Sequence, residues 1–243
     1  MIMPSDQDYK ETKLILQGKA SIKNEFKPLA EWINSTYDVK TINILYDTIE
    51  PNNRPRLQIC FEFLNEKKKF DLAYFSFDPE KQKAVGEALK RTLGAQALIK
   101  KAWFWNLFKN INKRYYVVDD IFVYFSAFEP IARQEANESI SKKSLERLKE
   151  QIEDKNLWEI FNAFEGVTFF LYTDEQVKQY DNSGEKQRWS KMYFEILKDH
   201  DEFHYYNEHD FSISFDSKEN FDNNYQSNWY YYMKWFRLEK HKI

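Results

Sequence analysis

The sequence predicts an α+β fold in which an antiparallel sheet packs against several helices. Two runs near the N-terminus alternate apolar and polar residues and are separated by turn-forming residues, a pattern typical of paired antiparallel strands. Apolar residues elsewhere recur at three-to-four spacing, which is typical of helices with one buried face. The chain also contains 21 Phe, 16 Tyr and 7 Trp, and these large side chains can bury enough apolar surface to form a core.

The N-terminal third is expected to form one helix followed by a three-stranded antiparallel meander. The helix should cover Ser21–Asn34, with a late start or a kink at Pro28 because proline lacks a backbone N–H. The three strands are expected at residues 42–48, 57–63 and 70–77. The connections between them are turn-rich, so consecutive strands should pair antiparallel.

The middle of the chain is expected to form two helices and a long strand. Asp78 can cap free N–H groups and Pro79 suits a first helical turn, so a helix should begin here and end at Gly94. A second helix is expected over Ala95–Asn112. Tyr115–Phe128 is mostly apolar and ends before a proline, which indicates a strand.

The C-terminal half is expected to mix short helices with strands. Helices are predicted at residues 145–152, 157–164 and 189–197, and a buried strand at 167–172. Residues 192–197 also alternate, so a strand is the alternative there. Residues 211–215 and 229–235 alternate on either side of a polar stretch, which indicates a closing hairpin with a long loop.

The chain length suits one large domain. We expect 243 residues to form a single unit, and the polar stretch Arg133–Ser144 is the best candidate for a sub-domain boundary, near residues 130–144. The two halves share a loose order of helix, strand and hairpin, but no convincing sequence repeat.

Composition and charge favour a cytoplasmic location. The N-terminus lacks the pattern of a secretory signal, and no apolar run approaches the ~18 residues of a membrane span. Cys60 is the only cysteine, which excludes an internal disulfide. Charge is uneven: residues 95–118 carry five basic residues and no acidic ones, whereas residues 195–222 carry nine acidic residues against two lysines. Such asymmetry is typical of interaction surfaces, although two ordinary solvated faces also explain it.

No catalytic signature with a defined spacing is present. The five glycines are far apart, so the glycine-rich loops that hold phosphate groups cannot form. Cys60 lies in the middle of a predicted strand beside Glu62, whose charge would oppose thiolate formation. We therefore expect a small packed residue at Cys60, no catalytic residue and no cofactor.

A histidine cluster is the sharpest candidate for a metal site. His200, His204 and Glu208 fall at four-residue spacing, which would put two imidazoles and a carboxylate on one face of a helix. Such a set can bind Zn²⁺ and leave a position open for water, as a metal-dependent hydrolase requires. The segment has poor helix propensity, however, and a solvated acidic loop is the alternative.

The basic aromatic segment at residues 100–116 is a second candidate. On a helix, Lys101, Trp105 and Lys109 share a face that could contact a nucleic-acid backbone and stacked bases. The segment could also lie on an anionic membrane surface. The alternative is a helix whose rings pack in the core while the lysines lie at its rim.

The aromatic C-terminus is a third candidate, this time for binding a protein. If residues 229–235 form a strand, one face lines the core and the other presents Tyr230, Tyr232 and Phe236. Exposed Tyr and Trp are typical of binding hot spots, although a strand covered on both faces fits equally well. Acidic residues of the preceding stretch, among them Asp201, Glu202 and Asp210, could attract a basic partner.

These observations favour a non-catalytic binding protein that acts through a protein partner. The grounds are the missing catalytic motifs, the separated charge and the abundant Tyr and Trp. Small acidic cytoplasmic proteins that neutralise a toxin, as immunity proteins do, share this general character. The competing classes are a metal-dependent hydrolase using the histidine cluster and a nucleic-acid-binding protein using the basic segment.

Overall fold

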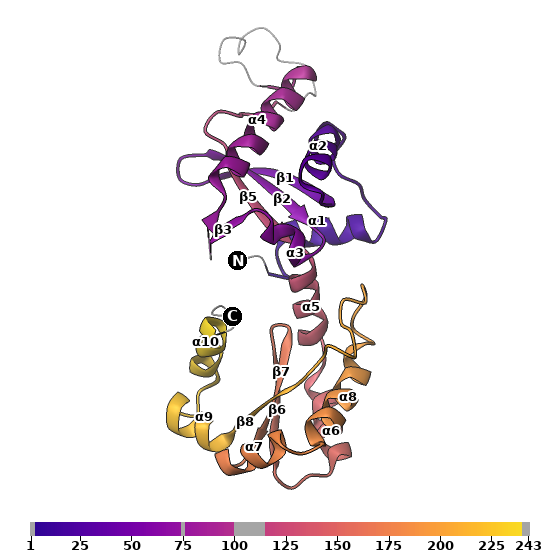
Figure 1. Cartoon of the computed structure of the whole chain (residues 1–243), viewed down its shortest axis with the longest axis vertical. Coiled ribbons are helices and arrows are strands. Elements are labelled where there is room, and N and C mark those ends of the chain that lie inside the picture. The colour runs from indigo at the N-terminus through magenta and orange to yellow at the C-terminus, as the bar shows by residue number, and fades with distance from the viewer. Residues whose placement is uncertain (1–2, 74–75, 100–114, 240–243) are drawn as a thin grey trace. The chain divides into compact units, whose positions relative to one another are not determined.

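The computed structural model describes residues 3–73, 76–99 and 115–239, with the backbone alone for 235–239. Contacts divide the chain into two compact units, Met1–Pro130 and Ile131–Ile243 (Figure 1). Each unit combines helices with a small sheet, so the predicted α+β class is confirmed. The division falls beside the stretch 130–144, which is mostly helical rather than an extended linker.

The first unit is built around a three-stranded sheet with the order β1-β2-β5. Its elements are α1 (Gln7–Leu16), the 3₁₀ helix η1 (Asn24–Phe26), α2 (Lys27–Tyr37), β1 (Thr41–Ile49), β2 (Arg54–Phe61), α3 (Leu64–Lys68), β3 (Asp71–Ala73), β4 (Ser76–Phe77), α4 (Pro79–Ala95) and β5 (Phe122–Ala127). β1 and β2 pair antiparallel, and β5 pairs parallel to β2. The strands β3 and β4 form a separate small sheet.

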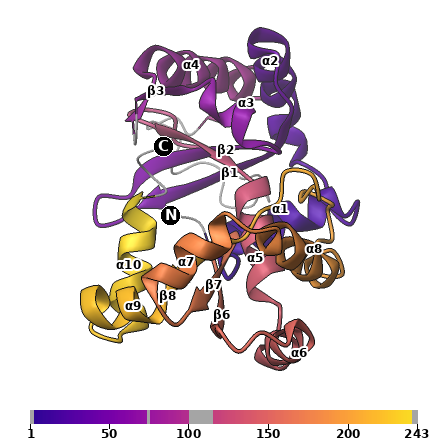
Figure 2. The same ribbon diagram turned by 60° about the horizontal axis from the view of Figure 1, so that its bottom comes forward.

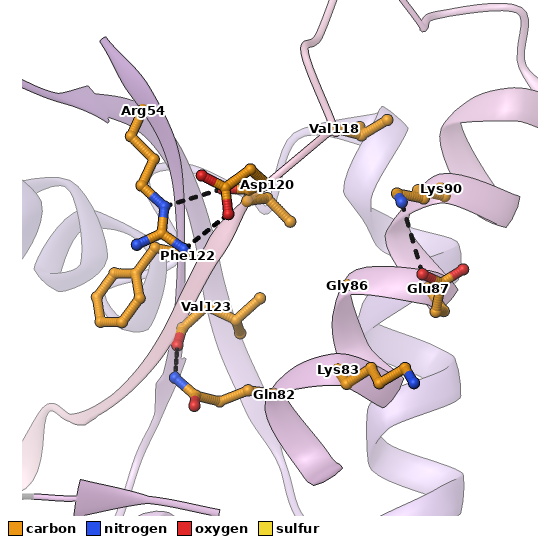
Figure 3. A pocket seen from close by; sticks show the side chains of 11 residues that line it. Arg54, Gln82, Lys83, Gly86, Glu87, Lys90, Val118, Asp120, Phe122 and Val123 are labelled. Carbon is orange, nitrogen blue, oxygen red and sulfur yellow. Dashed lines mark hydrogen bonds and ion pairs between the residues drawn. The ribbon is translucent and has the colours of Figure 1, made fainter. Parts of the chain in front are cut away.

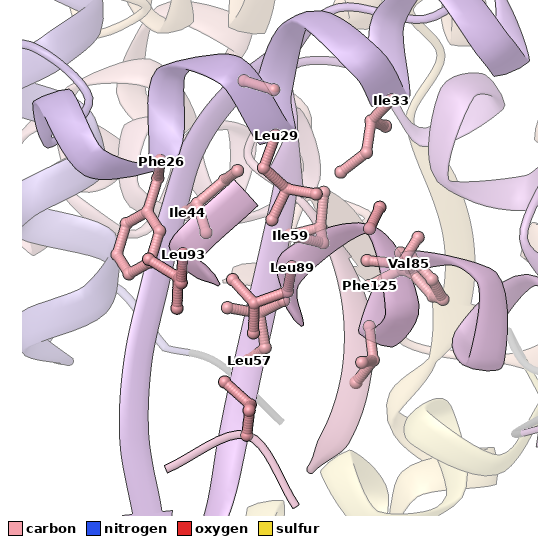
Figure 4. Close-up of a cluster of buried hydrophobic side chains, with 14 of the residues drawn as sticks. Phe26, Leu29, Ile33, Ile44, Leu57, Ile59, Val85, Leu89, Leu93 and Phe125 are labelled. Atoms are coloured by element: carbon pink, nitrogen blue, oxygen red, sulfur yellow. The ribbon is translucent and has the colours of Figure 1, made fainter. Parts of the chain in front are cut away.

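The core of the first unit lies between this sheet and the helices α2 and α4. Alternate strand residues, including Ile44, Ile59 and Phe125, meet Leu29 and Leu89 from the two helices (Figure 4). The predicted start of α4 is confirmed, because the Asp78 carboxylate accepts hydrogen bonds from the backbone N–H groups of Glu80 and Lys81. The helix α1 lies on the other face of the sheet (Figure 1 and Figure 2).

The second unit is built around another three-stranded sheet, with the order β6-β7-β8. Its elements are α5 (Glu129–Glu138), which starts at the boundary, α6 (Lys142–Ile152), β6 (Leu157–Ala163), β7 (Gly166–Leu171), α7 (Asp174–Asp181), α8 (Glu185–Leu197), β8 (Ser214–Ser217), α9 (Lys218–Tyr225) and α10 (Trp229–Glu239). β6 and β7 pair antiparallel, and β8 pairs parallel to β7. The main core packs α6 and α8 on one face of this sheet.

The opposite face of the second sheet is covered by α9 and α10 (Figure 1 and Figure 2). Trp229 of α10 stacks on Phe161 with a centroid distance of 4.4 Å, and Tyr232 meets Phe170 at 5.1 Å. The Tyr232 hydroxyl donates to the Asp216 carboxylate of β8 at 2.8 Å. Aromatic contacts therefore hold α10 to the sheet, because each ring buries a large apolar area.

The two units repeat one arrangement, down to the register of the strands. In each, the first pair has a β-bulge at the same place, and the third strand pairs with equivalent residues of the second. The matched pairs are Thr41–Phe61 and Leu157–Leu171, Asn43–Cys60 and Glu159–Phe170, and Ile59–Phe125 and Phe169–Phe215. The two units therefore form a structural repeat, although no repeat was convincing in the sequence.

An equivalent hydrogen bond in each unit supports this correspondence between the two sheets. The Glu129 carboxylate accepts from the backbone N–H of Leu64 at 3.2 Å, and the Glu219 carboxylate accepts from Asp174 at 3.1 Å. Each glutamate follows the third strand of its unit and caps the helix that follows the second. Free N–H groups at a helix start favour an acceptor with negative charge. In both units, a glutamate after the third strand supplies that acceptor.

The predicted C-terminal hairpin is wrong, because residues 229–239 form the helix α10 and residues 218–225 form α9. Nearly every residue from 229 to 236 is aromatic, so the apolar pattern fits a strand or a helix equally well. The Asn228 side chain accepts from the Tyr230 N–H, which favours a helix start. Trp229 and Tyr232, three residues apart, then share the buried face.

The predicted three-stranded meander is correct only for its first two strands. Residues 71–73 and 76–77 form the short strands β3 and β4, and the third strand of the main sheet is β5. The connection containing α4 brings β5 back beside β2, and alternation within a strand does not reveal its partner. Of the predicted strand Tyr115–Phe128, only residues 122–127 form β5.

The predicted helix at 157–164 is also wrong, since these residues form β6. The bulge between Leu157 and Glu159 interrupts the alternation, so the buried residues Leu157, Ile160 and Ala163 recur every three positions. That spacing imitates a helix. The predicted helix Ala95–Asn112 lies largely outside the described residues, and residues 96–99 are not helical.

Within the described ranges, no helix is both long and apolar enough to cross a membrane.

Candidate functional site

The predicted partner-binding tyrosines lie on α10 but differ sharply in exposure. Tyr230 is 65% exposed and its neighbour Tyr231 is 46% exposed, whereas Tyr232 is 6% exposed and anchors the helix. Phe236 lies in the same helix, and its side chain is outside the described part of the structure. Among the side chains of α10 that the structure describes, the exposed aromatic ones are therefore Tyr230 and Tyr231 rather than Tyr230 and Tyr232.

The predicted acidic residues follow α8 in a segment of turns. Glu202 and Asp210 are exposed, as expected for residues that attract a partner. Asp201 is buried, and its carboxylate accepts a hydrogen bond from the Tyr206 N–H at 2.7 Å. Asp201 thus stabilises the turn, and the exposed acidic surface of this segment is carried by its neighbours.

The histidine cluster lacks the helix that its spacing required. α8 ends at Leu197, and His204 has a left-handed backbone with a φ of 56°. His200 instead shares a hydrogen bond with the Ser139 hydroxyl at 2.8 Å, and Glu208 is exposed. Among residues 3–73, 76–99 and 115–239, no group of three His, Cys, Asp or Glu side chains could hold a metal ion.

The basic segment at 100–116 lies almost entirely outside the described residues. Of its two described members, Tyr115 is exposed and Tyr116 is buried in the first core. Cys60 is buried in β2 as expected, and burial raises the pKa of its thiol to about 12. A thiol with so high a pKa is a poor nucleophile.

The first unit has a shallow polar pocket between α4 and β5 (Figure 3). Arg54 donates from Nε to the Asp120 carbonyl and from a terminal nitrogen to its carboxylate, both at 3.0 Å. Its guanidinium also lies 5.6 Å from the Phe122 ring centroid. Lys90 is 3.5 Å from Glu87. Most charges in this pocket are therefore already paired.

A second pocket, with a volume of about 530 Å³, lies between the start of α1 and the outer face of the sheet. Its walls are apolar and aromatic on the sheet side and acidic on the helix side. The lining residues are Asp6, Gln7, Asp8, Ile49, Arg56, Phe77, Phe122 and Tyr124. Phe122 and Tyr124 are stacked, with centroids 6.2 Å apart.

The charged groups of the second pocket are held in different ways. Arg56 donates to both carboxylate oxygens of Asp47, and this bond raises the pKa of the guanidinium. The same guanidinium lies 5.4 Å from the Tyr124 centroid. Asp8 has no ion pair or side-chain hydrogen bond to any described residue; burial, followed by the charge of Asp47, raises the pKa of its carboxyl group.

The sequence offered only a weak signal for this pocket. Arg54 and Arg56 alternate on one strand, as do Phe122 and Tyr124 on another, so each pair shares a face. The parallel pairing of β2 with β5 is what brings the arginines beside the rings. That pairing spans α4 and could not be read from local periodicity.

No family model matches the chain, and no curated protein or solved structure matches it.

Proposed function

We propose that this chain is a non-catalytic cytoplasmic protein that binds a basic protein partner, in the manner of an immunity protein. The observation that carries the proposal is α10, which presents two exposed tyrosines while the rest of its described aromatic residues hold it to the sheet. The acidic surface before β8 supports the choice of a basic partner.

The tyrosines suit a binding role because their cost of ordering is low. A tyrosine side chain has two rotatable bonds but a large contact area, so little conformational entropy is lost when it is buried in an interface. Tyr230 and Tyr231 also lie on a helix whose position is fixed by Trp229 and Tyr232. A preorganised helix surface binds with a smaller entropic cost than a free segment.

The charge of the second unit supports electrostatic attraction. Residues 195–222 carry a net charge of −7, and Glu202, Glu208 and Asp210 are exposed. Such a surface raises the rate at which a basic protein associates, and the effect weakens as salt screens it.

The proposal is tested by capturing a partner with wild-type protein and with the double variant Tyr230→Ala/Tyr231→Ala. Loss of hot-spot tyrosines should weaken the complex at least about tenfold. The matched control is Tyr115→Ala, because Tyr115 is 46% exposed, as Tyr231 is, but lies in the first unit. Equal binding by the wild type and the double variant would remove the basis of the proposal.

A further inference from the structure

The outer face of the first sheet carries side chains that the shared fold does not need. The two units have the same strand register, so positions can be compared one by one. Where the first unit has Asp47, Arg56 and Tyr124, the second has Ala163, Gly166 and Ser214. Because the second unit forms the same strand register with small residues, that register does not by itself require the charged and aromatic set of the first unit.

This face already binds two guanidinium groups of its own chain. Arg56 is held between the Asp47 carboxylate and the Tyr124 ring, and Arg54 between Asp120 and the Phe122 ring. At each position a carboxylate accepts a hydrogen bond and an aromatic face attracts the cation. Both carboxylate oxygens of Asp47 accept from Arg56, whereas Asp120 accepts from Arg54 with its backbone carbonyl and one carboxylate oxygen. This surface therefore binds a guanidinium group at two positions.

Asp8 supplies a third carboxylate beside the same rings, and no described cation is bonded to it. It lines the second pocket together with Phe122 and Tyr124. Arg56, the cation that acts on Asp8, is already held by both oxygens of Asp47. The pocket also contains Asp6, so the unmatched charge on its helix side is negative.

We propose that this pocket receives an arginine side chain of the protein partner, with its guanidinium on Asp8 and its stem against Phe122 and Tyr124. The proposal rests on the proposed function, since it names the group by which a basic partner is recognised. An anion is disfavoured here, because Arg56, the arginine among the described residues that line the pocket, is neutralised by Asp47. A free small cation would share this chemistry, and the test separates it from a partner side chain.

The test is a titration of the full-length, ¹⁵N-labelled protein with the peptide acetyl-Gly-Arg-Gly-amide, followed by amide chemical shifts. The arginine peptide should shift the amides of residues 6–8, 56 and 124 and saturate them. The same peptide with citrulline, which has the shape of arginine without its charge, should bind at least about tenfold more weakly. Equal binding of the two peptides, or shifts confined to other regions, would overturn the proposal.

The variant Asp8→Asn should weaken the arginine peptide at least about tenfold, because a charged acceptor is replaced by a neutral one. The matched control is Asp38→Asn, since Asp38 is an exposed aspartate at the end of α2 in the same unit. Unchanged binding by Asp8→Asn contradicts the proposal. Agmatine, a free guanidinium compound, should not bind more tightly than the peptide; if it binds tenfold more tightly, the pocket serves a small molecule instead.

Failure of the pocket proposal can be told apart from failure of the protein-binding proposal. Partner capture that depends on Tyr230 and Tyr231 but not on Asp8, with no binding of the arginine peptide, rejects the pocket and leaves the protein-binding proposal standing. Binding of the arginine peptide at Asp8, with no captured protein, supports a guanidinium site and rejects a protein partner.

Discussion

Asp8 is a residue at which stability and binding are expected to oppose each other. Burial and Asp47 raise the pKa of its carboxyl group, while Arg56 acts in the opposite direction and Glu11 and Asp6 add to the rise. A raised pKa in the folded state means that the neutral form is favoured there, so ionised Asp8 destabilises the fold at neutral pH.

We therefore predict that Asp8→Asn increases the free energy of unfolding at pH 7. The stability that protonated Asp8 contributes is fully present below the ordinary aspartate pKa and is lost as pH rises through the raised pKa. The variant should therefore be more stable than the wild type at pH 7, and this difference should shrink as the solution is acidified. Urea unfolding of both proteins at several pH values measures this difference. A less stable variant at pH 7 would contradict it. A binding residue that costs stability is a common compromise at functional sites.

The Cys60 thiol is expected to be inert while the protein is folded. Its pKa is raised to about 12, first by burial, so the thiolate fraction at pH 8 is on the order of 10⁻⁴. Ellman's reagent should therefore label the folded protein only as fast as the sheet opens, and label the urea-unfolded protein at once. Rapid labelling in native buffer would show that β2 is accessible.

At the scale of elements, the paired glutamates give a matched prediction. Glu129→Ala and Glu219→Ala should each lower the free energy of unfolding by about 1 kcal/mol, because each leaves one backbone N–H at the start of a helix without its acceptor. Glu146→Ala, an exposed change on α6, is the control and should alter stability by less than about 0.5 kcal/mol. Chemical unfolding of the three variants tests whether the two caps are equivalent.

The attachment of α10 depends on one hydrogen bond as well as on stacked rings. Tyr232→Phe removes the donor to Asp216 and should cost about 1.5–3 kcal/mol, the range for hydrogen bonds to charged groups. Tyr230→Phe changes an exposed hydroxyl on the same helix and should cost little. Equal stability of the two variants would mean that the bond to Asp216 contributes nothing measurable.

Several elements could be predicted because their signals are local. The cap at Asp78, the helical spacing of α8 and the alternation of β1 and β2 each depend on neighbouring residues, and all three are confirmed. α1 and α7 were missed because they are mostly polar: α1 buries only Tyr9 and Thr12, and α7 has no buried residue. β6 and α10 were assigned wrongly because a bulge and a continuous run of rings disguise the true period.

The candidate sites depended on longer-range structure and were less predictable. Tyr230 and Tyr232 were expected on one exposed face of a strand, and the burial of Tyr232 beside an exposed Tyr230 required knowing that α10 is a helix. The second pocket required the parallel pairing of β2 with β5 and the position of α1. Neither follows from the period of a single segment.

For the whole molecule, we predict that the second unit folds without the first. Residues 129–243 contain a core between β6–β8 and the helices α6 and α8, and a second cluster under α9 and α10. A fragment of these residues should show cooperative unfolding and dispersed amide resonances. A fragment that gives a random-coil spectrum would show that its core depends on the rest of the chain.

The repeat also suggests a division of roles within one chain. The same sheet occurs twice, but in the first unit its outer face carries arginines and rings, whereas in the second α9 and α10 cover it. The two units thus carry different surfaces on the same kind of sheet: the proposed guanidinium pocket in the first, and a helix with exposed tyrosines and nearby acidic residues in the second. This difference fits a partner that is recognised at two places.

Affinity purification from the native cells at two salt concentrations shows whether the chain binds a basic protein. The Debye length, over which charges interact, falls from about 30 Å at 0.01 M salt to about 3 Å at 1 M. We expect a basic protein that is retained at low salt, is largely lost at high salt, and is recovered in smaller amounts with Tyr230→Ala/Tyr231→Ala. Recovery of no protein under either condition, or of a partner bound equally at both salt concentrations, would contradict it.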